Sequence, residues 1–243
     1  MRIGITVAQS DRLANPAAVV AAVNAAEQLG YSSVWVCDSA LDPAGVLSAA
    51  AAVKGRVGLG AGIVVGDRED PVSLARSLTK LDVLSEGRLT VALGGHEEAL
   101  AEVLDEVAAG RTPVLLDGCS PWALDRVARR AAGWSPTGVA VDDLEPMWAT
   151  VQRLAAGHGR DPEALRLVVR AGVVLAPAPA GNGRTSYEGD ADQVADDVDA
   201  THRSGAEEVV LRLGGDISLD EALDGYARIA EATELLQASR QRA

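Results

Sequence analysis

Short runs of aliphatic and β-branched residues alternate along the chain with longer stretches whose apolar residues recur at helical spacing. Eight of the short runs read as strands, and they open near Arg2, Ser33, Val57, Arg88, Thr112, Gly133, Leu167 and Glu207. Strands that alternate with helices favour a parallel sheet, because each connection between parallel strands needs a crossover. The pattern therefore predicts eight βα units.

The predicted helices carry their own start signals. Three of them open on a polar residue followed by proline, at Asn15-Pro16, Asp70-Pro71 and Ser120-Pro121. Proline is tolerated in the first turn of a helix, and the polar side chain before it can cap the free amides. For the last helix, Ser218 and Glu221 have the spacing of a capping box.

We interpret the whole chain, residues 1–243, as one α/β domain with the (β/α)8 fold of a TIM barrel. The main alternative is a Rossmann-type sheet, which would need Gly-x-Gly-x-x-Gly after the first strand, where residues 1–30 hold only Gly4 and Gly30. The later run from Gly58 to Gly62 also fails, because Ile63 stands at the third glycine position. The stretch Pro177–Gly189 predicts a mobile loop after the seventh strand, on the active face, where it could serve as a lid.

Charge and cysteine content narrow the function classes. The chain has 35 acidic and 22 basic side chains, a formal net charge of -13, which disfavours nucleic acid and anionic membranes as partners. No apolar run is long enough to span a membrane and the first residues lack a signal-peptide pattern, so we expect a cytoplasmic protein. Cys37 and Cys119 have no Cys-x-x-Cys spacing, which predicts reduced thiols and no structural metal site.

Chemistry in such a barrel belongs at the carboxyl ends of the strands, and this sequence places few catalytic side chains there. Lys54 and Lys80 fall in helices, no Gly-x-Ser-x-Gly is present, and of the three histidines only His96 follows a strand. His96 could move a proton near neutral pH or simply begin a helix. In the late loops and strands, Arg184, Tyr187 and Arg212 are the residues best placed to meet an anion or a ring.

Glycines dominate the remaining strand ends, at Gly60, Gly62, Gly66, Gly94, Gly95, Gly118, Gly214 and Gly215. Glycine lets the backbone approach a flat ligand or a phosphate closely, and it is equally an ordinary turn residue.

Several stretches resemble the luciferase-like monooxygenase family. They are Leu29–Asp38, Pro71–Arg88 with the strand that runs on to His96, Thr112–Pro121, Ala131–Pro136 and Gly189–Leu211. The resemblance implies a (β/α)8 barrel that uses FMN or coenzyme F-420. It further implies that the cofactor phosphate lies near Gly118, Cys119 and Ser120, and that the ring contacts Asp38, Ser39, Ala61, Gly62, Gly94 and Gly95.

The sequence departs from the family pattern at the same places. Ser39 stands where relatives commonly have histidine or another polar residue that contacts the ring. Ala61 stands where they have threonine, and Asp117 where they usually have a second glycine before Gly118. A carboxylate beside a phosphate is unfavourable unless a cation intervenes. The connection between the fourth and fifth strands, long in relatives, is shortened to one helix within residues 96–110.

Two functional hypotheses follow from the resemblance and its departures. The first is an oxidoreductase or monooxygenase that uses FMN or coenzyme F-420 on a small organic substrate, with His96 as the catalytic candidate and a homodimer as the expected assembly. The second is a ligand-binding barrel of the same descent, without turnover, whose cofactor binding is weakened or lost. Neither predicts a metal.

Overall fold

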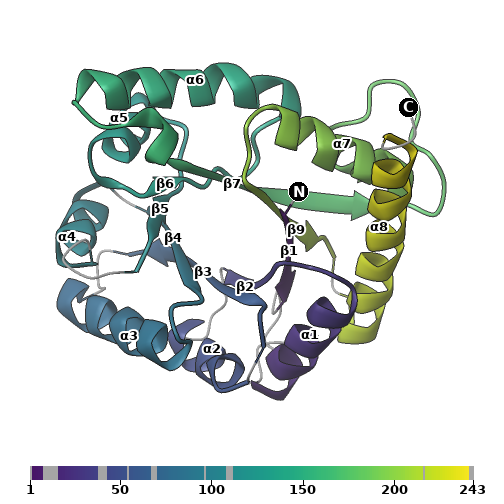
Figure 1. Cartoon of the computed structure of the whole chain (residues 1–243), viewed down its shortest axis with the longest axis horizontal. Coiled ribbons are helices and arrows are strands. Elements are labelled where there is room, and N and C mark those ends of the chain that lie inside the picture. The colour runs from purple at the N-terminus through teal and green to yellow at the C-terminus, as the bar shows by residue number, and fades with distance from the viewer. Residues whose placement is uncertain are drawn as a thin grey trace.

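Eight parallel strands close into a barrel with the helices outside it, as the sequence predicts (Figure 1). The computed structural model describes residues 2–7, 16–37, 43–53, 55–66, 70–95, 97–107, 112–215 and 217–240. The barrel strands are β1 (Arg2–Val7), β2 (Ser33–Cys37), β3 (Gly58–Val65), β4 (Leu89–Gly95), β5 (Val114–Leu116), β6 (Gly133–Trp134), β7 (Arg166–Leu175) and β9 (Glu208–Leu213). They pair in the order β6-β5-β4-β3-β2-β1-β9-β7, and the pairing of β6 with β7 closes the ring. All eight predicted strands begin within two residues of the positions expected from the sequence.

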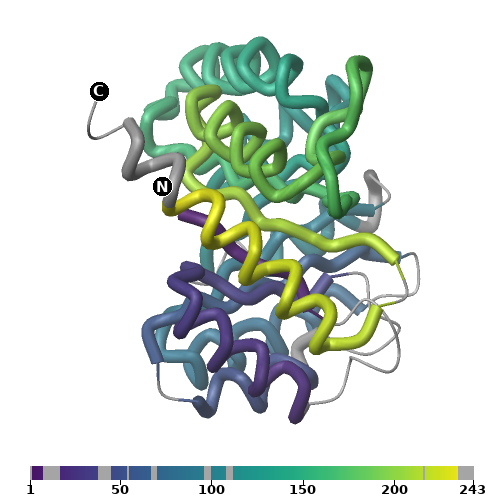
Figure 2. Tube along the Cα trace, turned by 90° about the vertical axis from the view of Figure 1, so that its right-hand side faces the viewer, coloured from purple at the N-terminus to yellow at the C-terminus, as the bar shows by residue number. Residues whose placement is uncertain are grey.

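The helices form a ring around this barrel. They are α1 (Pro16–Gln28), α2 (Pro43–Ala51), α3 (Pro71–Leu84), α4 (Glu97–Val107), α5 (Pro121–Arg130), α6 (Val141–Gly157), α7 (Ala191–Arg203) and α8 (Leu219–Arg240), with a 3-10 turn η1 (Pro162–Ala164) before β7. The last helix, α8, packs between α1 and α7 and so joins the end of the ring to its start (Figures 1 and 2). Among the residues that the structure describes, one short strand was not predicted: β8 (Glu188–Gly189), which pairs with the end of β7.

The predicted helix starts are confirmed where the structure describes them. Asp70 Oδ2 accepts a hydrogen bond from the Ser73 amide at 3.2 Å. At α8, the Glu221 amide donates to Ser218 Oγ at 3.2 Å while the Ser218 amide donates to Glu221 Oε2 at 2.8 Å, which is a complete capping box. These local bonds explain why helix positions could be predicted from neighbouring residues alone.

Alternate residues of each strand face opposite sides of the sheet and build two separate apolar layers. The larger layer lies between the strands and the helices. The smaller layer fills the barrel and consists of Trp35, Cys37, Ala92, Leu115, Val168 and Val210. Trp35 occupies the middle of this inner layer with 1% of its surface exposed.

Gly60 makes room for the indole of Trp35. The two residues lie opposite each other on β3 and β2, and a Cβ at position 60 would lie 1.9 Å from Trp35 Cδ2. Below the ring, Trp35 Nε1 donates to Ser33 Oγ at 2.9 Å, and Ser33 Oγ donates to the buried Glu208 carboxylate at 2.5 Å. The amino-terminal end of the barrel is therefore sealed by an indole above a hydrogen-bonded carboxylate.

Arg88 explains the Gly-Arg ending of the long helical stretch that carries the family resemblance. Its guanidinium donates to four backbone carbonyls, those of Ser85, Val57, Ala51 and Val53, at 2.9 to 3.2 Å. These bonds tie the end of α2 and the start of β3 to the end of α3. One of the stretches that carry the resemblance, Pro71–Arg88, thus ends on a residue with a structural role, at the end of the barrel opposite the expected site.

No described helix is both long enough and apolar enough to cross a membrane.

The contact between Gly60 and Trp35 predicts a specific stability effect. Gly60→Ala should lower the free energy of unfolding by about 3 kcal/mol, because the added methyl overlaps the indole and forces the packed interior to shift. In a Trp35→Leu background the same substitution should cost much less, since the smaller side chain leaves space for the methyl. Urea denaturation of the four proteins measures this coupling, and an equal cost in both backgrounds would contradict the packing described.

Candidate functional site

Three adjoining hollows cross the carboxyl-terminal end of the barrel. The first has a volume of about 370 Å³ and lies between the ends of β4 and β5 and the start of α5. Its lining consists of Gly94, Gly95, Leu100, Asp117, Gly118, Cys119, Ser120, Trp122, Ala123 and Thr137. A volume of this size falls within the range of small-molecule sites.

The first hollow brings together five of the residues expected to bind a cofactor: Gly94, Gly95, Gly118, Cys119 and Ser120. The backbone conformation itself requires glycine at two of these positions. Gly118 has φ +111° and Gly95 has φ +131°, conformations that disfavour other residues. The structure thus brings these five residues together, and their role toward a cofactor stays a prediction.

The other predicted site residues are placed differently. Gly62 faces the barrel interior, where an added Cβ would meet Cys37 Sγ at 2.6 Å and Arg170 Nη1 at 2.8 Å. Ala61 is fully buried in the apolar layer between strands and helices and lines none of the three hollows. Asp38, Ser39 and His96 lie outside the residues that the structure describes.

Arg170 and Asp117 form an ion pair at the centre of the barrel mouth. Arg170 Nη2 lies 2.6 Å from Asp117 Oδ2, and only 11% and 26% of the two side chains are exposed. The sequence indicated that a carboxylate at position 117 would need a nearby cation, and Arg170 supplies it. Arg170 itself was missed, although the alternation of Val168, Arg170 and Gly172 along β7 points the side chain into the barrel.

Asp117 also accepts hydrogen bonds from its surroundings. Its Oδ1 accepts hydrogen bonds from the amides of Gly118, at 2.7 Å, and Thr137, at 3.2 Å. The Thr137 hydroxyl donates to Oδ2 at 3.3 Å. The carboxylate therefore takes up donors at the place where the resemblance puts a phosphate.

The electrostatics of the first hollow also act on Cys119. Partial burial and then the negative charge of Asp117 raise the pKa of the Cys119 thiol. Because the thiolate is the reactive form, Cys119 is a poor nucleophile at neutral pH. Cys37 is buried in the inner apolar layer.

The second hollow is small, about 20 Å³, and lies over the inner layer of the barrel. It is lined by Thr6, Cys37, Thr137, Arg170, Ala171, Gly172 and Arg212. Thr137 is shared with the first hollow, so the two adjoin. Arg212, predicted to be well placed for an anion, reaches this hollow from β9.

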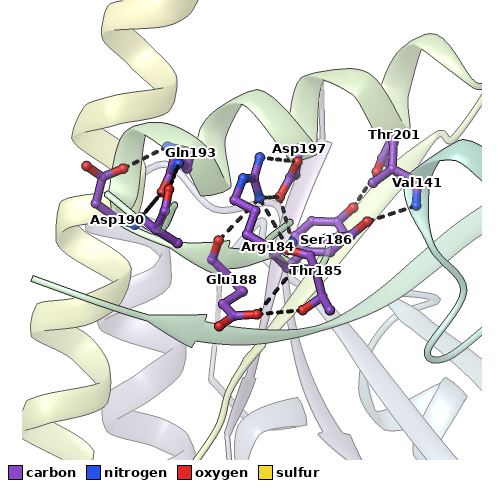
Figure 3. A network of polar contacts seen from close by, with 11 residues as sticks. Val141, Arg184, Thr185, Ser186, Glu188, Asp190, Gln193, Asp197 and Thr201 are labelled. Atoms are coloured by element: carbon purple, nitrogen blue, oxygen red, sulfur yellow. Dashed lines mark hydrogen bonds and ion pairs between the residues drawn. The ribbon is translucent and has the colours of Figure 1, made fainter. Parts of the chain in front are cut away.

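The third hollow adjoins the second across Arg170, Ala171 and Gly172. It has a volume of about 270 Å³ and is completed by Gly138, Val139, Ala140, Thr185, Ser186 and Tyr187. The last three residues belong to the stretch after β7 that was predicted to be a loop. In the structure this stretch is fastened to α7 by side-chain contacts (Figure 3).

Asp197 on α7 is the centre of this fastening. Its carboxylate accepts hydrogen bonds from both Nη atoms of Arg184, at 2.6 and 2.9 Å, and from the Tyr187 amide, at 2.6 Å (Figure 3). Gln193, one turn earlier, bonds both the amide and the carbonyl of Ala180, at 2.7 and 3.0 Å. Arg184, considered from the sequence as an anion contact, instead holds the loop.

The fastening carries backbone strain at Tyr187, which has φ +64°. Its ring is buried and its hydroxyl contacts Thr201, while burial is the main cause that raises the pKa of the phenol. Ser186 Oγ accepts the Val141 amide at 3.1 Å, which joins the loop to the start of α6. The wall of the third hollow is therefore set by contacts to two helices.

No cluster of metal-ligating side chains occurs within the described residues. Two of the three histidines are described, and both are engaged elsewhere. His158 Nε2 lies 2.9 Å from Asp125 Oδ1, and the His202 ring nitrogens lie 2.7 and 3.1 Å from the carbonyl oxygens of Ala206 and Arg2.

Comparison with known proteins agrees with this fold. A model of the luciferase-like monooxygenase family matches residues 2–106, and the chain thus resembles that family as the sequence suggested. No curated protein matches the chain.

Solved structures share the whole barrel at low identity. The coenzyme F-420 dependent tetrahydromethanopterin reductase from Methanopyrus kandleri has a TM-score of 0.75 and 15% identity, covering 93% of this chain and 97% of its own. An F-420-dependent secondary alcohol dehydrogenase in complex with an F-420-acetone adduct has a TM-score of 0.79 and 13% identity, covering 96% and 98%. The long-chain alkane monooxygenase LadA has a TM-score of 0.75 and 11% identity, covering 98% and 92%.

The fastening of the loop predicts a stability effect at Asp197. Asp197→Asn should lower the free energy of unfolding by about 3 kcal/mol, since it leaves the guanidinium of Arg184 partly buried without its carboxylate. The loop at residues 176–187 should also become more sensitive to limited proteolysis. Asp196→Asn, which removes an exposed carboxylate from the same helix, is the matched control and should change stability by less than about 0.5 kcal/mol. Equal effects of the two substitutions would show that the contacts do not hold the loop.

Proposed function

We propose that the chain is an oxidoreductase or monooxygenase that uses FMN or coenzyme F-420 on a small organic substrate, with the cofactor in the first hollow. The observation that carries this proposal is the convergence of Gly94, Gly95, Gly118, Cys119 and Ser120 on one hollow at the strand ends. Those residues come from two separate βα units. The family match, the coenzyme F-420 dependence named for two of the similar structures and the monooxygenase activity named for the third support the choice of cofactor class.

The residues present fit a flat cofactor in two respects. Side chains at Gly94 and Gly118 would narrow the hollow, because added Cβ atoms would lie 3.3 Å from Asp117 Cβ and 3.0 Å from Ala123 Cβ. The amino-terminal end of α5 opens into the same hollow, with Ser120 as its cap, and a helix start favours an anionic group.

A bound flavin or deazaflavin would supply the redox chemistry, because the side chains that line the hollows cannot transfer a hydride themselves. The chain would bind and orient it. Trp122 forms part of the wall and is itself held by Arg126, whose guanidinium carbon lies 5.4 Å from the centre of the indole. The substrate would enter from the second and third hollows, on the other side of Thr137.

One observation favours the second candidate, a ligand-binding barrel without turnover. The Gly118 amide, expected near the cofactor phosphate, already donates to Asp117 Oδ1. The structure therefore supports binding that is weaker than in a relative with glycine at position 117, and a direct measurement of binding separates the two candidates.

Cys119 provides a probe of the first hollow. It is the exposed thiol in a chain with two cysteines, so a maleimide at pH 8 should label it much faster than the buried Cys37. If FMN or coenzyme F-420 occupies the hollow, it should slow this labelling, and the concentration for half protection should equal the Kd from quenching of the cofactor's fluorescence. Mass spectrometry after proteolysis measures the labelling.

Two variants serve as controls for this experiment. Cys119→Trp should fill the hollow and abolish saturable quenching, whereas Val83→Trp adds the same side chain at an exposed position on α3 and should not. Absence of saturable quenching by either cofactor would reject the redox function and favour the ligand-binding barrel. Quenching without protection of Cys119 would place the cofactor elsewhere.

A further inference from the structure

Two arginines from neighbouring strands converge on the second hollow. Arg170 belongs to β7 and Arg212 to β9, and both line the hollow with Thr6 and Cys37. In the parallel register Gly172 lies opposite Arg212, and a Cβ at Gly172 would be 4.0 Å from Arg212 Nη2. The Arg212 side chain thus extends over the part of β7 that separates the second and third hollows.

The positive charge of this pair is only partly neutralised. Arg170 is paired with Asp117, as described above. Arg212 forms no ion pair or side-chain hydrogen bond within the part of the chain that the structure describes. A protein with a formal charge of -13 therefore keeps an uncompensated guanidinium at the mouth of its barrel.

Arg170 also has a donor to spare. Its Nε is buried, and within the described residues no group accepts a hydrogen bond from it. Its Nη1 has only a long contact of 4.0 Å to Cys37 Sγ. A buried unsatisfied donor is costly, by about 1 to 3 kcal/mol, and calls for a reason.

We propose that the second hollow binds the carboxylate group of a small molecule, with Arg212 as its main partner and Arg170 as a second source of positive charge. The planar fork of a guanidinium matches a carboxylate or a phosphate. The hollow is small, with a volume of about 20 Å³, and this favours the flat carboxylate over the larger tetrahedral phosphate.

The rest of the ligand lies in the third hollow. This hollow adjoins the second across Gly172, has a volume of about 270 Å³, and is lined by Val139, Ala140 and Ala171 together with the residues 185–187. Neither a free carboxylate nor a further arginine lines it among the described residues, so the body of the ligand is uncharged. The ligand class is a short-chain monocarboxylate.

This inference rests on the proposed function only if the carboxylate is taken as the substrate of the oxidoreductase. Binding of the carboxylate itself requires no flavin. It is therefore tested on the protein without added cofactor, separately from the labelling of Cys119.

The test compares butanoate with butanamide, which has the same body and no charge, and with inorganic phosphate. Isothermal titration calorimetry at constant ionic strength measures the affinity of each. Butanoate should bind saturably. Butanamide should bind at least tenfold more weakly because it cannot form the charged hydrogen-bonded pair with the guanidinium. Phosphate should also bind at least tenfold more weakly, because its tetrahedral shape does not fit the hollow.

Variants at the two arginine positions locate the site. Arg212→Gln should weaken butanoate at least tenfold, Arg212→Lys should weaken it less because it keeps the charge, and Arg56→Gln should have no effect. Arg56 is an exposed arginine at the opposite end of the barrel, just before β3. Far-ultraviolet circular dichroism checks that each variant is folded.

The outcomes are distinct. Equal affinity of the wild type and Arg212→Gln for butanoate, or equal affinity of the wild type for butanoate and butanamide, would overturn the proposal. Tighter binding of phosphate would overturn the assignment to a carboxylate. If butanoate binds through Arg212 while neither cofactor shows saturable quenching of its fluorescence, the redox function fails and the carboxylate site stands.

Discussion

The architecture depends on one contact inside the barrel, the packing of the Trp35 indole into the space that Gly60 leaves open. Eight short strands enclose an interior that must be filled to the density of a protein core. One large ring opposite a glycine does this with few side chains, and the hydrogen bonds from Trp35 through Ser33 to Glu208 hold the ring in place. The Trp35 indole fills the barrel interior below the strand ends, so the polar residues at the strand ends line an open mouth above it.

At that mouth the central interaction is the ion pair between Arg170 and Asp117. It divides one opening into adjoining hollows, and it removes the electrostatic objection to a carboxylate beside an anionic ligand. The same carboxylate accepts the Gly118 amide and both donors of Thr137, so it competes for donors with any phosphate that enters the first hollow. Asp117 therefore stabilises the empty mouth and weakens it as an anion site, whereas Arg212 keeps its charge for a ligand.

The elements of the fold could be predicted because their signals are local. A polar residue before proline, a capping box or an alternating run acts within a few residues of the position it determines, and the structure begins its strands and helices there. The first hollow could be predicted because parallel strands bring their carboxyl ends together, so glycines distant in sequence meet. The roles of Arg170 and Asp197 depend instead on contacts with residues that are 53 and 13 positions away in the sequence. The sequence alone does not show that such residues lie close together in space. Arg88 lies in one of the stretches that resemble the family, yet its four carbonyl contacts serve the fold rather than the site.

The long strand β7 links the stability of the barrel to the shape of the site. Its residues Arg170, Ala171 and Gly172 border two hollows, and its far end pairs with β8 and carries the loop that α7 holds through Asp197. A ligand that spans the second and third hollows would touch one rigid strand and one fastened loop. Such a surface is formed before binding, so little conformational entropy has to be lost when the ligand binds. The strained backbone at Tyr187 fits this view, because a non-glycine residue keeps a positive φ only where its surroundings fix it, and here they fix it beside the proposed ligand.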